Sequence, residues 1–138
     1  MLQTSSILII DQEPTIADLL VEILTDAGYI AYTAPDDTSA LAAIAHLPPA
    51  LLLQDLGRPS MHSAQRIETM RQAGLATTPM VLMTTTPHDA APLLVPGAVE
   101  CLAKPFDLDD LFACVARYVQ PLAAEPASLA LSGLVAST

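Results

Sequence analysis

The fold is decided by residues 7–28, which read ILIIDQEPTIADLLVEILTDAG. The first four residues are apolar, which favours a buried β-strand. From Ile16 onward, apolar side chains recur at i, i+3, i+4, i+7 and i+8, and this spacing predicts an amphipathic helix. Pro14 suits the first turn of that helix and Gly28 suits its end. The stretch therefore predicts one strand followed by one helix.

The alternation of strand and helix continues along the chain. Strand-like apolar runs occur at Ile7–Ile10, Ile30–Thr33, Leu51–Leu53, Met80–Met83 and Cys101–Ala103. Further helices are predicted at 38–47, at 63–73 and after an Asp107 cap. Three prolines between residues 87 and 96 allow at most a short or kinked helix there. This order predicts an α/β fold, a doubly wound five-stranded parallel sheet with helices on both faces.

Length and composition set the broad class of the protein. The chain has 138 residues, 52% of them apolar, enough for one domain with its own core. We expect that domain at 1–120 and a flexible or partner-binding tail at 121–138. The net charge of −10 would repel nucleic acid, so protein partners are expected instead. No apolar stretch approaches the roughly 20 residues of a membrane span, and the N-terminus lacks a secretory pattern, so we predict a cytoplasmic location.

Polar side chains follow four of the five predicted strands. Asp11 follows the first strand, Asp55 the third and Thr84 the fourth, while Lys104, the only lysine in the sequence, follows the fifth. Ligands of open parallel sheets bind outside the carboxyl ends of the strands, so these side chains are expected to meet at one edge. Two carboxylates, a hydroxyl and a cation at one edge indicate a phosphate site.

Five segments in register resemble the receiver domain of bacterial two-component response regulators, the CheY-like fold. They read ILIIDQEP at 7–14, LLLQDLGRP at 51–59, PMVLMT at 79–84, PGA at 96–98 and KPF at 104–106. Their order and spacing agree with that family over nearly the whole chain. The resemblance implies a flavodoxin-like three-layer sandwich with the strand order 2-1-3-4-5.

The resemblance also assigns a role to each residue at the predicted edge. It makes Asp55 the phosphoacceptor, and it makes Thr84 and Lys104 the side chains that sense and bind phosphate. Asp11, Asp55 and the backbone carbonyl of Gly57 would hold Mg²⁺. Such an arrangement suits the chemistry, because a carboxylate attacks phosphorus poorly unless a divalent ion and a cation neutralise the transferring oxygens.

Two positions depart from the family pattern. Gln12 stands where a second acidic residue is usual, which makes it a weak or lost metal ligand and predicts Mg²⁺ binding weaker by on the order of 10- to 100-fold. Cys101 occupies the switch position, where an aromatic residue is usual, so an aromatic–threonine switch is not expected. The Lys104–Pro105 peptide bond, by contrast, is expected to be cis as in that family.

The favoured interpretation is a stand-alone response regulator receiver, phosphorylated on Asp55 by a histidine kinase or a phosphotransfer protein. It would signal through a downstream protein target, because the residues after 120 are too few for a DNA-binding module; a homodimer is compatible with this interpretation.

The alternative is a pseudo-receiver, a phosphorylation-independent protein-interaction module, which Gln12 and Cys101 favour. A phosphatase of the haloacid-dehalogenase type fits less well, because Glu13 replaces its second aspartate. Beyond self-phosphorylation from small donors and slow autodephosphorylation, we expect no enzymatic activity.

Overall fold

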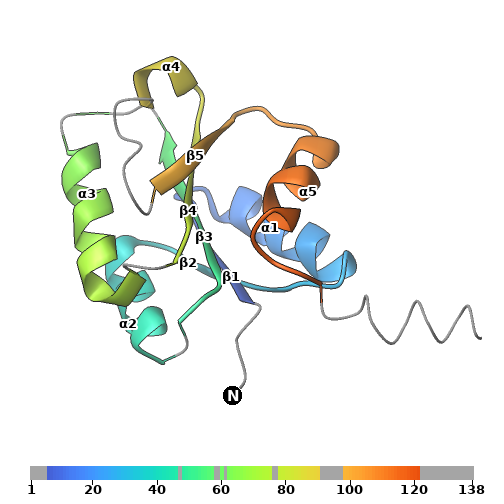
Figure 1. Cartoon of the computed structure of the whole chain (residues 1–138), viewed down its shortest axis with the longest axis horizontal. Coiled ribbons are helices and arrows are strands. Elements are labelled where there is room, and N and C mark those ends of the chain that lie inside the picture. The colour runs from blue at the N-terminus through green and yellow to red at the C-terminus, as the bar shows by residue number, and fades with distance from the viewer. Residues whose placement is uncertain are drawn as a thin grey trace, which may run out of the picture.

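The computed structural model describes residues 6–46, 48–57, 60, 62–75, 78–90 and 98–121. Within them, five parallel strands form one sheet in the order β2-β1-β3-β4-β5 (Figure 1). The strands are β1 (Ser6–Ile10), β2 (Ile30–Ala34), β3 (Leu51–Gly57), β4 (Met80–Thr84) and β5 (Ala98–Ala103). The helices are α1 (Pro14–Asp26), α2 (Asp37–His46), α3 (Ser63–Met70), the π-helical turn η1 (Arg71–Leu75), α4 (Pro87–Ala90) and α5 (Leu108–Ala116). The predicted α/β class and strand order are confirmed.

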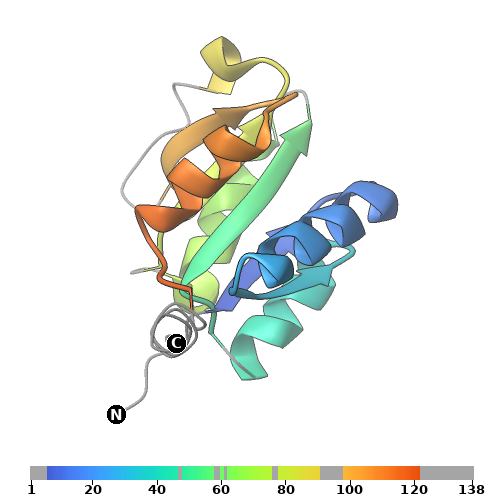
Figure 2. The same ribbon diagram turned by 90° about the vertical axis from the view of Figure 1, so that its right-hand side faces the viewer.

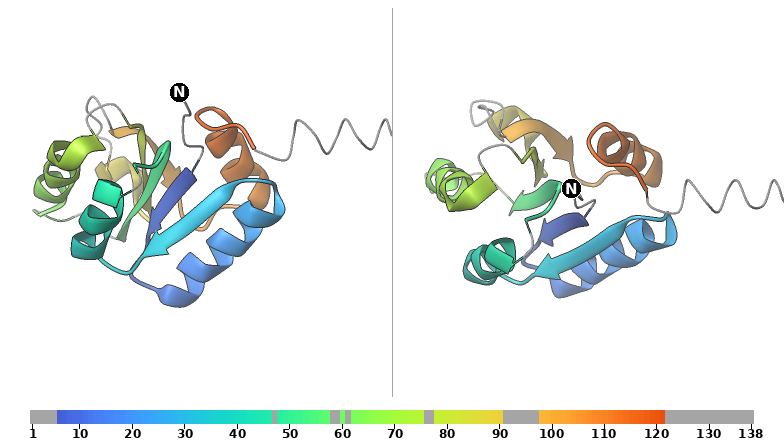
Figure 3. Two further views of the ribbon diagram at one scale, coloured as in Figure 1. Left: turned by 90° about the horizontal axis from the view of Figure 1, so that it is seen from below. Right: turned by 60° about the horizontal axis from the view of Figure 1, so that its bottom comes forward.

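Helices cover both faces of the sheet. α1 and α5 pack on one face, and α2 and α3 pack on the other (Figures 2 and 3). Alternate residues of each central strand supply the two cores: Ile7 and Ile9 of β1 face α1 and α5, whereas Leu8 and Ile10 face α2 and α3. Because both faces are covered, β1 and β4 are buried along their whole length, as their apolar runs predicted.

The predicted helix ends are confirmed at α1 and α5. Pro14 occupies the first turn of α1, where the missing backbone N–H has no helical partner to lose. Gly28 follows the end of α1 with a φ of 97°, a conformation that glycine adopts without a steric penalty. Asp107 caps α5 and accepts a hydrogen bond from the backbone N–H of Asp110 at 2.8 Å.

Several elements differ in length from the prediction. β3 continues through two polar residues to Gly57, because pairing with β1 and β4 holds them in the strand. The helix predicted over 63–73 is α-helical as far as Met70, and a π-helical turn continues it to Leu75. α4 has four residues; residues 91–97 and the tail from 122 to 138 lie outside the described part. No helix in the described ranges is both long and apolar enough to cross a membrane.

The register of the strands brings the predicted site residues together. The last residue of β1 pairs with the residue before Asp55, so Asp11 and Asp55 lie side by side at the carboxyl end of the sheet. Thr84 at the end of β4 pairs with Ala103 at the end of β5, and Lys104 follows directly. All four polar residues therefore lie at one edge, as predicted from their positions after the strands.

Candidate functional site

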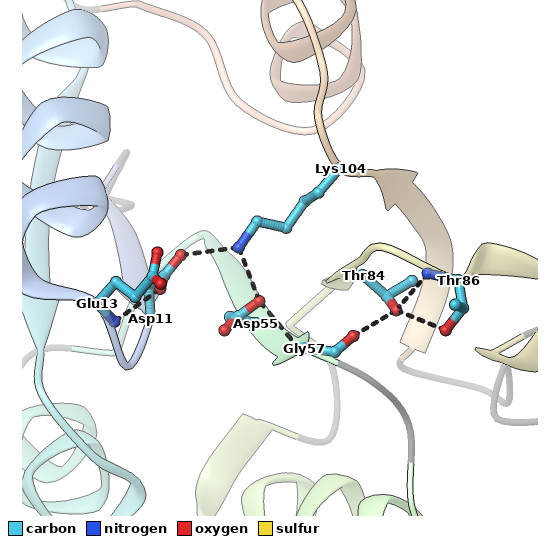
Figure 4. Close-up of polar contacts among 7 residues, drawn as sticks. All are labelled: Asp11, Glu13, Asp55, Gly57, Thr84, Thr86 and Lys104. Atoms are coloured by element: carbon cyan, nitrogen blue, oxygen red, sulfur yellow. Dashed lines mark hydrogen bonds and ion pairs between the residues drawn. The ribbon is translucent and has the colours of Figure 1, made fainter.

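Lys104 links the two predicted carboxylates. Its Nζ lies 3.0 Å from Oδ1 of Asp55 and 3.4 Å from Oδ2 of Asp11 (Figure 4). The Asp11 side chain is fully buried, and the side chains of Asp55 and Lys104 are 9% and 20% exposed. Water screens charges poorly at such depth, so the ammonium offsets the repulsion between the two carboxylates. The Lys104–Pro105 peptide bond is cis, as expected.

Lys104 keeps its charge in this environment. Burial by itself would lower the pKa of the ammonium, because it removes the charge from water. The hydrogen bond and the negative charge of Asp55, followed by those of Asp11, oppose this effect and raise the pKa above its ordinary value of 10.5. Lys104 is therefore a cation at neutral pH, as a phosphate-binding side chain must be.

Backbone N–H groups orient both carboxylates. Oδ1 of Asp11 accepts a hydrogen bond from the N–H of Glu13 at 3.0 Å, and Oδ1 of Asp55 accepts one from the N–H of Gly57 at 3.1 Å. In each case the donor lies two residues further along the chain, as in an Asx turn. Because Oδ1 of Asp55 also contacts Lys104, Oδ2 is the oxygen of Asp55 that has no hydrogen bond within the described ranges. Oδ2 is thus the less engaged of the two carboxylate oxygens.

The Thr84 hydroxyl lies on the other side of Gly57 from the carboxylates (Figure 4). Its Oγ1 donates to the carbonyl oxygen of Gly57 at 2.6 Å, accepts a hydrogen bond from the N–H of Thr86 at 3.1 Å and lies 3.4 Å from the Thr86 hydroxyl. The register of β3 against β4 shifts between Asp55 and Gly57, and this shift pairs Gly57 with Thr84. Thr84 is completely buried. Its hydroxyl is therefore occupied by backbone partners.

Two predicted residues lie outside this group of contacts. Gln12 is exposed and lines, together with Asp11, a cavity of about 220 Å³ beside the acidic residues. Cys101 is half-buried and packs against the core under α2 and α3. Burial, and then the charge of Glu100, raise the pKa of the Cys101 thiol, so it is neutral rather than reactive. The roles expected of them, Gln12 as a weak or lost metal ligand and Cys101 as the switch position, stay predictions.

A second polar cluster lies on the opposite face of β3 and was missed by the sequence analysis. Gln54, the residue before Asp55, is fully buried and donates from Nε2 to Oδ1 of Asp37 at 3.5 Å. Arg66 of α3 contacts both oxygens of the same carboxylate, at 2.9 and 3.3 Å. Gln54 could have been noticed as a polar residue among apolar ones, whereas no motif connects Asp37 with Arg66. The role of Thr86 beside the Thr84 hydroxyl was missed for the same reason.

The donor set fits Mg²⁺ in chemistry, although the shell is incomplete. Asp11 and Asp55 supply the one or two carboxylates that this ion usually takes, alongside water and phosphate oxygens. The carbonyl of Gly57, the third predicted ligand, is directed at Thr84. Within the described ranges, no three acidic, histidine or cysteine side chains surround a common metal position. Solvent or phosphate would therefore have to complete the coordination.

A sequence model of the response regulator receiver domain matches residues 7–116. The chain belongs to this family. Among its relatives is the transcriptional regulatory protein KdpE of Mycobacterium tuberculosis, to which this receiver is 35% identical over 109 residues. The matched region covers 78% of this chain and 47% of KdpE. The receiver thus spans about half the length of that curated relative.

Solved structures agree with the family. The receiver is similar to the Vibrio cholerae chemotaxis protein CheY4, with a TM-score of 0.70 and 25% identity over 85% of this chain and 100% of CheY4. It is also similar to the response regulator TrrA of Thermotoga maritima, solved in complex with Mg(2+)-BeF, with a TM-score of 0.68 and 27% identity over 83% and 98% of the two chains. The fold prediction is confirmed by these neighbours.

Proposed function

We propose that this receiver accepts a phosphoryl group on Asp55 from a histidine kinase or a phosphotransfer protein and passes the signal to a downstream protein. One observation carries the proposal: the only lysine of the chain contacts both strand-end carboxylates. A cation and two carboxylates therefore lie in contact, and this supports roles for them as phosphate-binding group, nucleophile and metal ligands. A cytoplasmic location and the lack of nucleic-acid binding belong to the same proposal.

The transfer uses the residues as follows. An oxygen of Asp55 attacks the phosphorus of the donor, so one O–P bond forms, the N–P or O–P bond of the donor breaks, and the leaving group keeps the bonding electrons. Lys104 neutralises negative charge on the phosphoryl oxygens. Asp11 and Asp55 would hold Mg²⁺, which supplies further positive charge when bound. Beyond this transfer, we propose only slow hydrolysis of the acyl phosphate.

An apolar surface beside Lys104 supports transfer from a protein donor. Residues of α1, of the segment before α5 and of the first position of α5 line a cavity of about 270 Å³, and we call them the α1/α5 surface. They are Ile16, Leu19, Leu20, Ile23, Lys104, Pro105, Phe106 and Leu108. Leu19 and Leu108 are each 49% exposed. Large exposed apolar side chains around a hollow mark protein-interaction sites, so we place the donor on this surface.

The test is the intact mass of the protein after incubation with a small phosphodonor and excess Mg²⁺. We expect a phosphate adduct that is absent from Asp55→Asn and from a sample treated with chelator. Asp26→Asn serves as the matched control, because it makes the same change at an exposed site at the far end of α1. No adduct at any Mg²⁺ concentration would overturn the proposal and favour the pseudo-receiver.

A further inference from the structure

We infer that Thr84 is a positioning residue whose hydrogen bond turns the Gly57 carbonyl away from the metal-binding carboxylates, so that full binding of either Mg²⁺ or phosphate has to break it. The inference rests on the proposed function, but it concerns Mg²⁺ affinity rather than phosphoryl transfer. It assigns the Thr84 hydroxyl a role in the resting protein, in addition to its expected contact with phosphate.

The hydrogen bond between the two residues is short and buried. The distance from Thr84 Oγ1 to the Gly57 carbonyl oxygen is 2.6 Å, near the lower limit for bonds between oxygens. The N–H of Thr86 donates to the same hydroxyl oxygen at 3.1 Å. With that oxygen accepting from Thr86, the hydroxyl proton is directed at Gly57. Because Thr84 is fully buried, water cannot readily replace either partner.

The Gly57 carbonyl faces away from the acidic residues. In Figure 4 its oxygen lies on the Thr84 side, with Asp11, Asp55 and Lys104 on the other side. To ligate a cation held by the two aspartates, the carbonyl must turn and leave Thr84. The carbonyl turns by rotation about the Cα–C bond of Gly57, and a glycine, which has no Cβ, tolerates a wide range of backbone conformations, as its φ of 60° illustrates. A Cβ at Gly57 would meet no atom of the described residues within 4 Å.

Release of this hydrogen bond couples two binding events. When the Gly57 carbonyl turns towards the metal position, the Thr84 hydroxyl becomes available to phosphate. When Thr84 moves to phosphate, the carbonyl becomes available to the metal. Whichever ligand binds first breaks the hydrogen bond between Thr84 and Gly57, so the second ligand does not have to break it. By thermodynamic linkage, Mg²⁺ and phosphate therefore raise each other's affinity by the same factor.

Mg²⁺ titrations without any phosphodonor test the inference, using calorimetry and the amide NMR shift of Gly57. Thr84→Val keeps the shape of the side chain and removes the donor. We expect it to bind Mg²⁺ roughly 2- to 10-fold more tightly than the unmodified protein, the factor that corresponds to one net hydrogen bond. Thr84→Ser keeps the hydroxyl and should keep the original affinity. Thr78→Val is the matched control, because Thr78 also donates to a backbone carbonyl, that of Pro49 at 3.4 Å, before the start of β4.

Unchanged or weaker Mg²⁺ binding by folded Thr84→Val overturns the inference, and so does equally tighter binding by Thr78→Val. If Thr84→Val does not fold, the Mg²⁺ titration of the unmodified protein tests the inference instead. The carbon-13 shifts of the Gly57 carbonyl and of Thr84 Cβ should then change together along the titration; a change at Gly57 alone, or at neither, contradicts the inference. None of these measurements uses phosphoryl transfer. A lack of phosphorylation with this response intact would therefore count against the proposed function alone.

Discussion

The Nζ of Lys104 lies 3.0 Å from Oδ1 of Asp55, although 49 positions separate the two residues in the chain. Lys104 follows β5 and Asp55 lies within β3. These two strands are not neighbours in the sheet but flank β4 on its two sides. The lysine therefore reaches across the end of β4 to contact its partner. This contact forms only when β3, β4 and β5 have the correct order and register. The geometry of the candidate site therefore depends directly on the topology of the sheet.

Replacing Lys104 with methionine should slow phosphorylation of Asp55 from a small donor by roughly 10²-fold, the effect of losing one preorganised charge-stabilising group. Lys104→Arg keeps a positive charge in a different shape and should slow the reaction less. The rate is measured as the growth of the phosphate adduct in the intact mass at saturating Mg²⁺. Equal rates for Lys104→Met and the unmodified protein would show that the ammonium takes no part.

Gln12→Asp should lower the Mg²⁺ concentration needed for half-maximal phosphorylation by roughly 10-fold, because it adds a negative charge beside Asp11. Gln12→Asn, which shortens the side chain without adding charge, is the control and should have no comparable effect. The measurement is the phosphorylation rate as a function of Mg²⁺. If Gln12→Asp and Gln12→Asn behave alike, the charge of the pocket does not limit metal binding.

Much of this arrangement is predictable because it depends on local chemistry. Apolar runs locate the central strands, since both faces of a parallel sheet are buried. Asp107 and Gly28 mark helix ends through the backbone conformations that they favour. The meeting of Asp11, Asp55 and Lys104 follows from one rule, that the carboxyl ends of parallel strands share an edge.

The remaining features depend on register and packing, which no single segment encodes. The Thr84 hydroxyl contacts Gly57 because the pairing of β3 with β4 shifts between Asp55 and Gly57. Such a shift leaves no trace in the order of apolar residues. The contact of Asp37 with Arg66 likewise arises only once α2 and α3 pack side by side. Sequence reasoning therefore located the candidate site but not the hydrogen bonds around it.

Gln54→Leu should raise the free energy of unfolding by about 1 kcal/mol. Oε1 of Gln54 is buried and has no hydrogen-bond partner among the described residues, and an unpaired buried polar group costs roughly 1–3 kcal/mol. Nε2 contributes little in return, since its contact with Asp37 is 3.5 Å long. Urea unfolding measures the change. Gln54→Glu should destabilise the protein, because it buries a second carboxylate beside Asp37; greater stability of Gln54→Glu than Gln54→Leu would contradict this account.

Charged substitutions on the α1/α5 surface should separate protein donors from small ones. Leu19→Glu and Leu108→Glu remove apolar contacts beside Lys104, so each should slow transfer from a purified kinase or phosphotransfer protein by roughly 10-fold or more. Transfer from a small phosphodonor should be unchanged, because neither residue contacts the carboxylates. Ile30→Glu is the matched control, since Ile30 is a similarly exposed apolar residue on β2. If Ile30→Glu impairs transfer equally, the donor does not dock on the α1/α5 surface.

Glu100→Gln should lower the free energy of unfolding at neutral pH. It should also reduce the loss of stability that the protein shows as the pH falls. Glu100 on β5 contacts Arg117 at 2.7 and 3.0 Å and accepts a hydrogen bond from the Cys114 thiol at 3.0 Å. Burial would raise the pKa of Glu100, but the bonds from Cys114 and Arg117 and the charge of Arg117 outweigh it and lower the pKa below its ordinary value of 4.5. Cys114 remains a donor throughout, because burial and then Glu100 raise its pKa to about 12.

The direction of this pH dependence follows from linkage. A carboxylate whose pKa is lower in the folded protein adds stability above its unfolded pKa and loses it as the pH falls through the folded value. The difference in urea midpoint between Glu100→Gln and the unmodified protein should therefore be constant from pH 7 to about 5.5 and shrink below 4.5. Glu68→Gln, which alters the ion pair between exposed Glu68 of α3 and Arg71 of η1, is the control for a general charge effect. A difference that grows on acidification would show that Glu100 is destabilised by its burial.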